Sequence, residues 1–189
     1  RPCEDAKQGR IVVQTPKCNV PFGVNEFVPA GGQPKHSINL SLGGTSPVMQ
    51  KFLKFLNDFD EQNIATATTN SSSWFKKKLG TDVVEQLYRR QVNTSTKGYD
   101  PTLKVKFPTK NGEFLGDIFD SNKSPISMNQ ITKGCQVQAI VECVGMYFVA
   151  KEFGVTWRVV QIMVYPPAKL AGYAFVDDEG DEKDDAEPI

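Results

Sequence analysis

Basic and aromatic side chains stand side by side at several points of this 189-residue sequence. Lysine and arginine neutralise phosphates, and aromatic rings offer flat faces on which bases stack, at about 1–3 kcal/mol per stacked base. A set of this kind predicts binding of a single nucleic acid strand with little base specificity. The candidate nucleic-acid-binding residues are Trp74, Phe75, Lys76, Lys77, Lys78, Tyr88, Arg89, Arg90, Tyr99, Lys104, Lys106, Tyr147 and Arg158.

Each candidate also has a purely structural interpretation. The three consecutive lysines 76–78 are equally typical of a solvated surface. Three other aromatic residues, Phe107, Phe148 and Trp157, lie on apolar faces of predicted strands, so we expect them in the core. The prediction of strand binding therefore depends on the sum of the signals and on the charge of the body that carries them.

The net charge of zero conceals two parts of opposite sign. Residues 1–176 hold 21 basic and 14 acidic side chains and carry +7, whereas residues 177–189 hold eight acidic side chains and one lysine and carry −7. This division predicts a polyanion-binding body with an interaction tail, and a merely solubilising tail is the alternative. The acidic residues of the predicted disordered tail are Asp177, Asp178, Glu179, Asp181, Glu182, Asp184, Asp185 and Glu187.

The sequence lacks the arrangements that usually signal catalysis or metal binding. His36 is the only histidine and lies in a Gly/Pro-rich segment, where a solvated surface histidine is expected. The four cysteines include no Cys-x-x-Cys pair, and neither a phosphate-binding GxxxxGK[ST] loop nor a GxSxG motif is present. Asp117 and Asp120 are expected to be surface charges. We therefore predict no enzyme, no cofactor, no metal and, since no apolar run approaches about 20 residues, no membrane partner.

Periodicity divides the body into strands and an inserted helical segment. Strand-like runs are expected at residues 10–14 and 18–28, and residues 37–42 alternate strictly between polar and apolar. Ser46 and Pro47 predict the start of a helix whose apolar face runs to Phe59. The Ser/Thr-rich residues 64–73 are expected to form a loop, and Asp82 with Glu85 predicts a second helix to about Val92.

The period of two returns in the C-terminal half. Residues 103–107 place Lys104 and Lys106 on one face, and Asn111-Gly112 predicts a hairpin. Residues 134–149 form the longest predicted strand, with a bulge at Gly145 and buried free thiols at Cys135 and Cys143. Another strand is expected over residues 155–165.

These elements predict a mainly β fold with inserted helices, namely an OB-like barrel of about five strands with Greek-key wiring. One domain is expected over residues 1–176, with the helical insertion at about residues 46–93 and the acidic tail at residues 177–189.

A string of short motifs in the C-terminal part resembles a known family. GCQVQAIVECVGMYF (residues 134–148) is followed by FGVTWRVVQI (153–162) and then by GYAFVDD (172–178), and SPISM (124–128) precedes them. This order is similar to that of the phage-type single-stranded-DNA-binding proteins of large nucleocytoplasmic DNA viruses. Family tails typically end in an aromatic residue, whereas this chain ends in Glu187-Pro-Ile189.

The resemblance implies an OB barrel without a cofactor that binds single-stranded DNA in viral DNA replication, recombination or repair. It also implies a homodimer, and an acidic tail that contacts replication proteins such as a DNA polymerase or a helicase-primase. The expected location is the host cell, at cytoplasmic viral replication sites or in the nucleus. From the charge pattern we expect the tail to compete with nucleic acid for the basic groove.

Two other functions remain open from the sequence. One is a β-rich protein–protein interaction module with an acidic recruiting tail and no nucleic-acid role. The other is a secreted glycosylated domain, because the chain has four cysteines and Asn-x-Ser/Thr sequons at Asn39, Asn70, Asn93 and Asn122.

Overall fold

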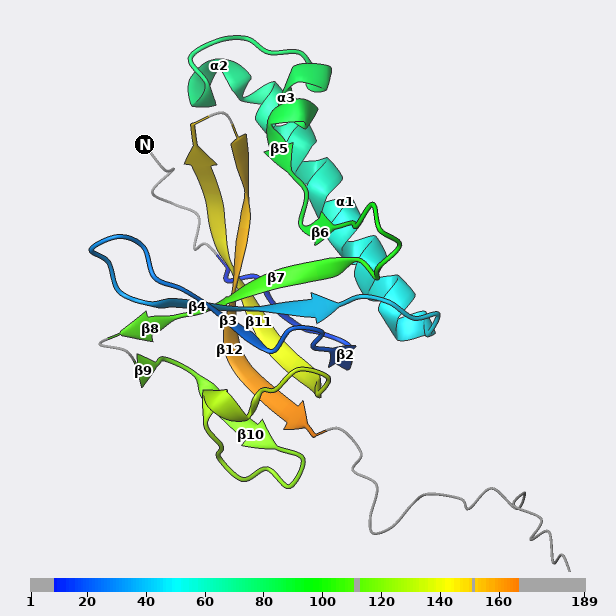
Figure 1. Cartoon of the computed structure of the whole chain (residues 1–189). Helices are drawn as coiled ribbons and strands as arrows, with labels where there is room; N and C mark the ends of the chain where they lie inside the picture. The colour runs from blue at the N-terminus through cyan, green and yellow to red at the C-terminus, as the bar shows by residue number, and fades with distance from the viewer. Residues whose placement is uncertain (1–8, 111–112, 151, 167–189) are drawn as a thin grey trace, which may run out of the picture.

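The computed structural model describes residues 9–110, 113–150 and 152–166. Its frame is a bent β-sheet in which the strands follow the order β1-β11-β12-β7-β4-β3 (Figure 1). These six strands are β1 (Val12–Gln14), β3 (Val24–Phe27), β4 (Lys35–Ser41), β7 (Thr102–Phe107), β11 (Gln136–Val149) and β12 (Glu152–Tyr165). Because β7 pairs with β4 on one side and with the distant β12 on the other, the strand order departs from the chain order.

The predicted mainly β, OB-like architecture is confirmed. The alternation read in residues 37–42 and 103–107 places Ile38, Leu40, Leu103 and Val105 in one core, together with residues of β11 and β12. Trp157 and Phe107 are buried there as expected, whereas Phe148 is half exposed. The main core thus takes one face of β4 and β7 and leaves the other face of β7 exposed.

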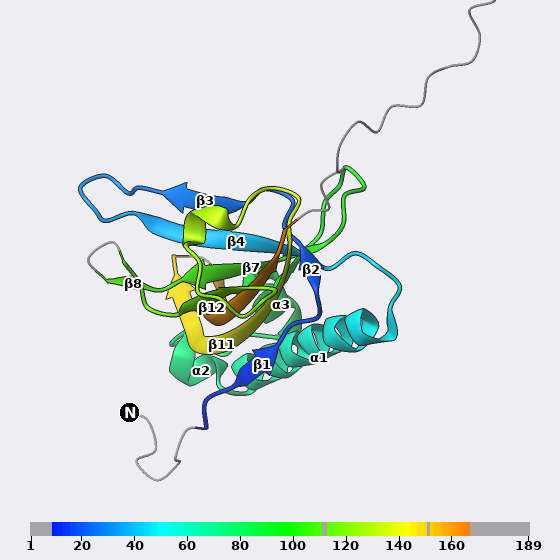
Figure 2. The same cartoon turned by 90° about the horizontal axis from the view of Figure 1, so that it is seen from below.

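Helix α1 (Pro47–Thr69) covers one side of the strands, opposite the β3–β4 hairpin (Figure 2). It begins as predicted, since the Ser46 hydroxyl accepts a hydrogen bond from the Met49 amide at 3.3 Å. The predicted loop at residues 64–73 is wrong, because α1 continues through it and α2 (Ser71–Trp74) follows. Ile64 and Ala67 extend the buried face, and the hydroxyls of Thr66, Thr68 and Thr69 bond to carbonyls four residues earlier.

Helix α3 (Thr81–Leu87) is shorter than predicted, and Asp82 with Glu85 does not form a capping box. Gly80 is the N-cap residue and offers no side chain, so the helix starts without a side-chain cap. It ends early because β5 (Tyr88–Arg89) pairs with β12, after which β6 (Val92–Asn93) pairs with β7. Pairing with the sheet therefore overrides the helical pattern of residues 88–92.

Strands β11 and β12 form a long hairpin that rises beside α2 and α3 (Figure 1). The register shifts at Gly145, as predicted, where φ is +133°, and it shifts again between Ile140 and Val141. Beyond these bulges Phe153 packs with Ile64, Val84 and Tyr88 in a second, smaller core. We call α2, α3, the adjoining end of α1 and this hairpin tip the helical lobe.

The remaining strands are short. β2 (Cys18–Asn19) pairs with β11, and β10 (Asp117–Asp120) runs parallel to β12. β8 (Thr109–Lys110) and β9 (Glu113–Phe114) pair on either side of the predicted Asn111-Gly112 turn, which lies outside the described residues. A 3-10 turn at Met128–Gln130 leads towards β11.

Cys18, Cys135 and Cys143 are free thiols, and Cys3 lies outside the described residues. Burial raises the pKa of the Cys18 thiol to about 11 and raises the pKa of Cys135 and Cys143 as well. These three cysteines therefore give no support to a disulfide framework.

Candidate nucleic-acid interface

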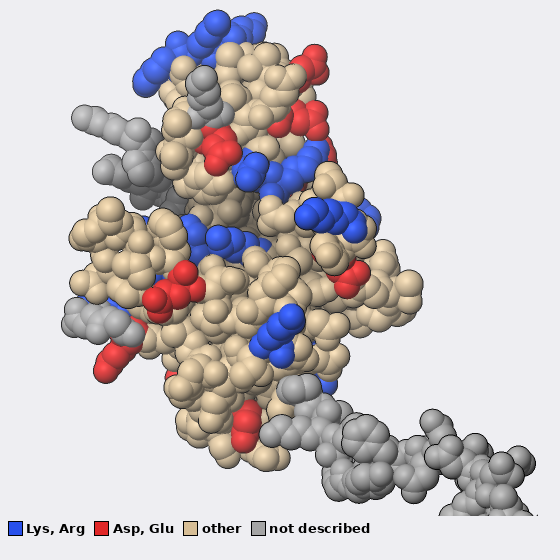
Figure 3. Space-filling model, viewed as in Figure 1, with Lys and Arg blue, Asp and Glu red and all other residues tan. Residues whose placement is uncertain are grey.

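A hollow lies where β5, β6 and β7 meet the β11–β12 hairpin. It collects five of the predicted site residues, which are far apart in the sequence. Figure 3 shows basic side chains within a recess in the middle of this face. We call it the basic hollow, and its lining consists of Arg89, Arg90, Gln91, Asn93, Leu103, Lys104, Lys106, Tyr147, Val155, Thr156 and Trp157.

Strand β7 places two lysines in this hollow. Leu103, Val105 and Phe107 point into the core, so Lys104 and Lys106 must stand on the opposite, exposed face. Their partners on the neighbouring strand β4 are the uncharged residues Asn39 and Ser37. Within the described part of the chain neither lysine forms an ion pair, so both ammonium groups are free for an anionic ligand.

Arg89 adds a guanidinium to the basic hollow. It is exposed at the end of β5, opposite Gly154 of β12, and no described residue forms a salt bridge with it. Arg90 differs, because its guanidinium donates to Glu61 and to Glu85 at 2.7 Å each, and these two carboxylates raise its pKa. Arg90 lines the hollow with much of its charge already compensated.

Tyr88 is not an exposed stacking residue, which corrects the sequence prediction. Its ring is buried against Phe153, with centroids 5.1 Å apart, and its hydroxyl donates to Asp60 at 2.7 Å. Burial, followed by the hydrogen bond to Asp60, raises the pKa of Tyr88. This side chain holds the helical lobe together and faces away from the basic hollow.

Arg158 lies beside Lys106 in the sheet register but is also compensated. Its Nε and a terminal nitrogen donate to one oxygen of Glu142 at 2.9 and 2.7 Å, and Arg10 approaches the other oxygen at 3.7 Å. The Glu142 side chain is 10% exposed and that of Arg158 40%. The predicted role of Arg158 as a free phosphate contact is therefore weakened by a partner 16 residues away.

Tyr147 supplies an aromatic ring to the wall of the hollow. It is half-buried, and it lies opposite Gly154 in the β11–β12 register and close to Arg89. Burial raises the pKa of its hydroxyl, with the Glu152 carboxylate acting in the same direction and Arg89 against it. The ring stays neutral at physiological pH and combines a face for stacking with a neighbouring cation.

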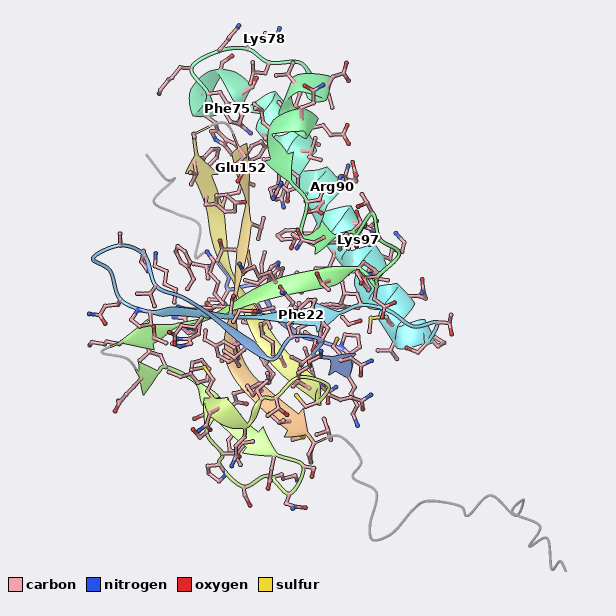
Figure 4. All side chains as sticks on the ribbon, in the orientation of Figure 1. Phe22, Phe75, Lys78, Arg90, Lys97 and Glu152 are labelled. Carbon is pink, nitrogen blue, oxygen red and sulfur yellow. The ribbon has the colours of Figure 1, made fainter. Side chains whose placement is uncertain are left out.

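The other aromatic and basic candidates lie elsewhere. Trp74 and Phe75 each pack edge to face on Phe148 at the tip of the helical lobe, with ring centroids 5.8 Å apart, and the three residues line a separate pocket. Lys76–Lys78 follow directly, and Figure 4 shows Lys78 at the end of this lobe, well away from Arg90. Trp74 keeps 37% of its surface exposed. The structure does not bring this group into the basic hollow, so its contact with nucleic acid stays a prediction.

Tyr99 is 72% exposed in the loop between β6 and β7 and does not line the basic hollow. Lys97 of the same loop is seen beside β7 in Figure 4.

Sequence reasoning missed a second hollow that shares Lys104 and Lys106 with the first. Its other wall is the β3–β4 hairpin, which contributes Lys35, His36 and Phe27, whose ring is 65% exposed. His36 is mostly buried, and its Nε2 lies 3.0 Å from a Glu26 oxygen, so it is not the solvated loop histidine expected from the sequence. Phe27 could have been found from the sequence, because it is an aromatic residue at the end of a predicted strand and precedes a Gly/Pro-rich loop.

The acidic tail residues 177–189 lie outside the described part of the chain. Among the residues that are described, no three or more His, Cys, Asp or Glu side chains gather as metal ligands. In the same ranges no helix is both long and apolar enough to cross a membrane.

Comparison with known proteins links the sequence to a viral relative and to a family. The model of a family of unknown function, DUF5871, matches residues 44–177. Uncharacterized protein L291 of Acanthamoeba polyphaga mimivirus is 27% identical over 168 residues, which is 85% of this chain. The aligned region is 27% of that relative, so the chain spans about a quarter of its length.

Similar solved structures include phage proteins. The gp2.5 single-stranded DNA binding protein of bacteriophage T7 has a TM-score of 0.58 at 12% identity, over 91% of this chain and 98% of that one. The single-stranded DNA-binding protein of bacteriophage Enc34, in complex with ssDNA, has a TM-score of 0.50 at 15% identity, over 88% and 91%. At these identities the likeness concerns the fold.

Proposed function

We propose that this chain, which belongs to the DUF5871 family of unknown function, binds single-stranded DNA without sequence preference through the basic hollow. One observation carries the proposal: three cations without an ion pair among the described residues, Arg89, Lys104 and Lys106, line the same hollow as the ring of Tyr147. Positive charge beside an aromatic face is the combination by which proteins hold single strands without base specificity.

The basic and aromatic residues of the hollow would bind different parts of the DNA strand. Lys104 and Lys106 stand two residues apart on one strand face, so they can neutralise successive backbone phosphates. Tyr147 offers a base a stacking surface beside Arg89. The second hollow extends the path past the two lysines towards Phe27, whose exposed ring is a further stacking surface.

The relatives support this proposal by their fold and their names. Proteins with this fold from two phages are named single-stranded DNA-binding proteins, and one was solved with ssDNA. The mimivirus relative is a viral protein, and we propose that this chain acts in replication, recombination or repair of viral DNA. We also propose that the protein works as a homodimer at cytoplasmic viral replication sites or in the nucleus.

The acidic tail completes the proposal. Its eight carboxylates are tethered to a body that carries +7, so they compete with DNA for the basic hollow at high effective concentration. When DNA displaces it, the tail is free to recruit replication partners such as a DNA polymerase or a helicase-primase.

A titration of the full chain tests the proposal. Fluorescence anisotropy with a labelled oligothymidine and with a matched duplex, at low and moderate salt, is expected to show single-strand preference and an affinity that falls as salt rises. A matched RNA strand shows whether the 2′-hydroxyl matters. Absence of binding to the oligothymidine at low salt would end the proposal and favour a protein–protein interaction module.

A further inference from the structure

A buried carboxylate lies behind the basic hollow. Asp60 of α1 is completely buried. Its Oδ1 accepts hydrogen bonds from the Tyr88 hydroxyl at 2.7 Å and from the Gln91 side-chain amide at 2.6 Å, and its Oδ2 accepts one from the Gln91 backbone amide at 3.1 Å. One side chain of the helix thus fixes both ends of the four-residue segment 88–91.

The two residues between these anchors differ from them in exposure. Tyr88 and Gln91 are buried, whereas Arg89 and Arg90 are exposed and line the basic hollow. Figure 4 shows Arg90 beside α1. Because the chain is held at both ends, the backbone of Arg89 has little freedom to turn, and its side chain starts from the side of the hollow.

The network continues into the hollow itself. The Gln91 side-chain oxygen accepts the indole N–H of Trp157, and its nitrogen also lies 3.4 Å from the Leu56 carbonyl. Trp157 is a lining residue of the hollow and precedes Arg158. Asn63 adds a hydrogen bond to the Tyr88 hydroxyl at 3.1 Å.

Burying the Asp60 carboxylate away from water costs desolvation free energy. Its presence here therefore suggests a role that an apolar side chain could not fill. No lysine or arginine among the described residues pairs with Asp60. Replacing buried ionic groups with well-packed apolar ones is often neutral or stabilising, so packing alone does not call for a carboxylate here. The Asp60 carboxylate can accept the three hydrogen bonds that converge on it, whereas a leucine side chain could accept none.

Glu61, the residue after Asp60, binds Arg90. Glu61 follows Asp60 on α1 and, with Glu85 of α3, holds Arg90 by its two terminal nitrogens. Arg90 is therefore secured to the helices, whereas the Arg89 guanidinium beside Tyr147 has no ion-pair partner in the described ranges.

We infer that Asp60 is a positioning residue for nucleic-acid binding: it orients the segment 88–91 so that Arg89 faces the basic hollow. The inference rests on the proposed function. Asp60 does not contact the bound strand, and its effect on affinity passes through Arg89.

The test is a double-mutant cycle in the full chain with Asp60→Asn and Arg89→Ala, read by anisotropy with labelled oligothymidine over a range of salt. Asp60→Asn keeps the size of the side chain but removes the charge and one acceptor. We expect it to weaken binding about tenfold, as the removal of one charged hydrogen bond would, and to lower the salt slope by about 0.7. In the Arg89→Ala background the same change should have little further effect.

Two controls separate positioning from loss of stability. Met49→Ala removes a buried side chain at the opposite end of α1, and should lower the melting temperature without changing affinity. Tyr88→Phe removes one donor of the network and keeps the ring, so it should weaken binding in the same direction by a smaller factor if Asp60→Asn fails to fold.

The outcomes are distinct. If wild type does not bind oligothymidine, the proposed function fails. If wild type binds and Arg89→Ala weakens it, but folded Asp60→Asn binds like wild type, this inference alone is overturned. It is overturned equally if Asp60→Asn costs the same factor with and without Arg89, or if Met49→Ala weakens binding as much.

Discussion

The ring of Tyr147 lies against Gly154 of the neighbouring strand, where a Cβ atom would come 3.0 Å from the tyrosine hydroxyl and 3.0 Å from the Arg89 carbonyl. Glycine at position 154 therefore lets both the Tyr147 hydroxyl and the Arg89 backbone lie close to β12. The phenol and the β5 segment can keep their places only while that position has no side chain.

Gly154→Ala should consequently weaken single-strand binding, because either the Tyr147 ring or the segment that carries Arg89 must shift. We expect the affinity to fall about three- to tenfold. This corresponds to a partial loss of the roughly 1–3 kcal/mol that one stacked base contributes. Anisotropy titration measures it. Gly80→Ala is the matched control, since a Cβ atom there meets nothing within 4 Å; an equal loss in both variants would contradict the prediction.

The lysines of β7 should determine much of the salt dependence. Lys104→Gln with Lys106→Gln removes two cations from the basic hollow, and should reduce the slope of log affinity against log salt by about 1.4, or 0.7 for each phosphate that is no longer neutralised. Lys76→Gln with Lys77→Gln removes the same charge from the helical lobe and should change the slope less. The reverse ranking would place the DNA path on the lobe.

Tyr147 and Trp74 should also differ in their effect on binding. Tyr147→Ala is expected to cost about 1–3 kcal/mol of binding free energy, as for a ring that stacks on a base. Trp74→Ala should cost less, because Trp74 packs against Phe148 outside the hollow. Quenching of intrinsic fluorescence by the oligonucleotide gives a second readout, and a larger loss for Trp74→Ala would show that the lobe binds DNA.

Removal of residues 177–189 should tighten single-strand binding and steepen its salt dependence. The deletion leaves a body with a charge of +7 and no tethered competitor. A variant of unchanged length, in which the eight acidic residues are replaced by their amides, should behave in the same way. Equal affinity of the three proteins at every salt concentration would rule out competition by the tail.

Alkaline pH should destabilise the protein through Cys18. Its pKa is raised from 9.0 to about 11, so the folded state favours the protonated thiol. The stability this provides is fully present below pH 9 and is lost as the pH rises towards 11, by about 3 kcal/mol in all. Urea unfolding at a series of pH values measures the loss. Cys18→Ala should flatten the curve over this window, and an identical curve would contradict the assignment.

Local periodicity was enough to predict much of the fold. The alternation in residues 37–42 and 103–107 indicated two central strands, and Ser46 with Pro47 indicated the start of α1. Prediction failed where tertiary contacts outweigh local preference: Ser and Thr in residues 64–73 form helix because their hydroxyls bond to the helix backbone, and residues 88–89 form strand because β12 offers them partners.

The sequence by itself determines the basic body and the acidic tail. It also determines the exposure of Lys104 and Lys106, because polar and apolar residues alternate along this strand. Which charges of the described residues stay without a partner depends instead on the tertiary structure. Arg90 and Arg158 are compensated by Glu61, Glu85 and Glu142, and Tyr88 is buried on Asp60, through contacts spanning 5 to 29 residues. The same folding brings Phe27 to the lysines of β7. A strand pattern fixes the face on which a side chain stands, but its partners depend on which distant segments pack beside it.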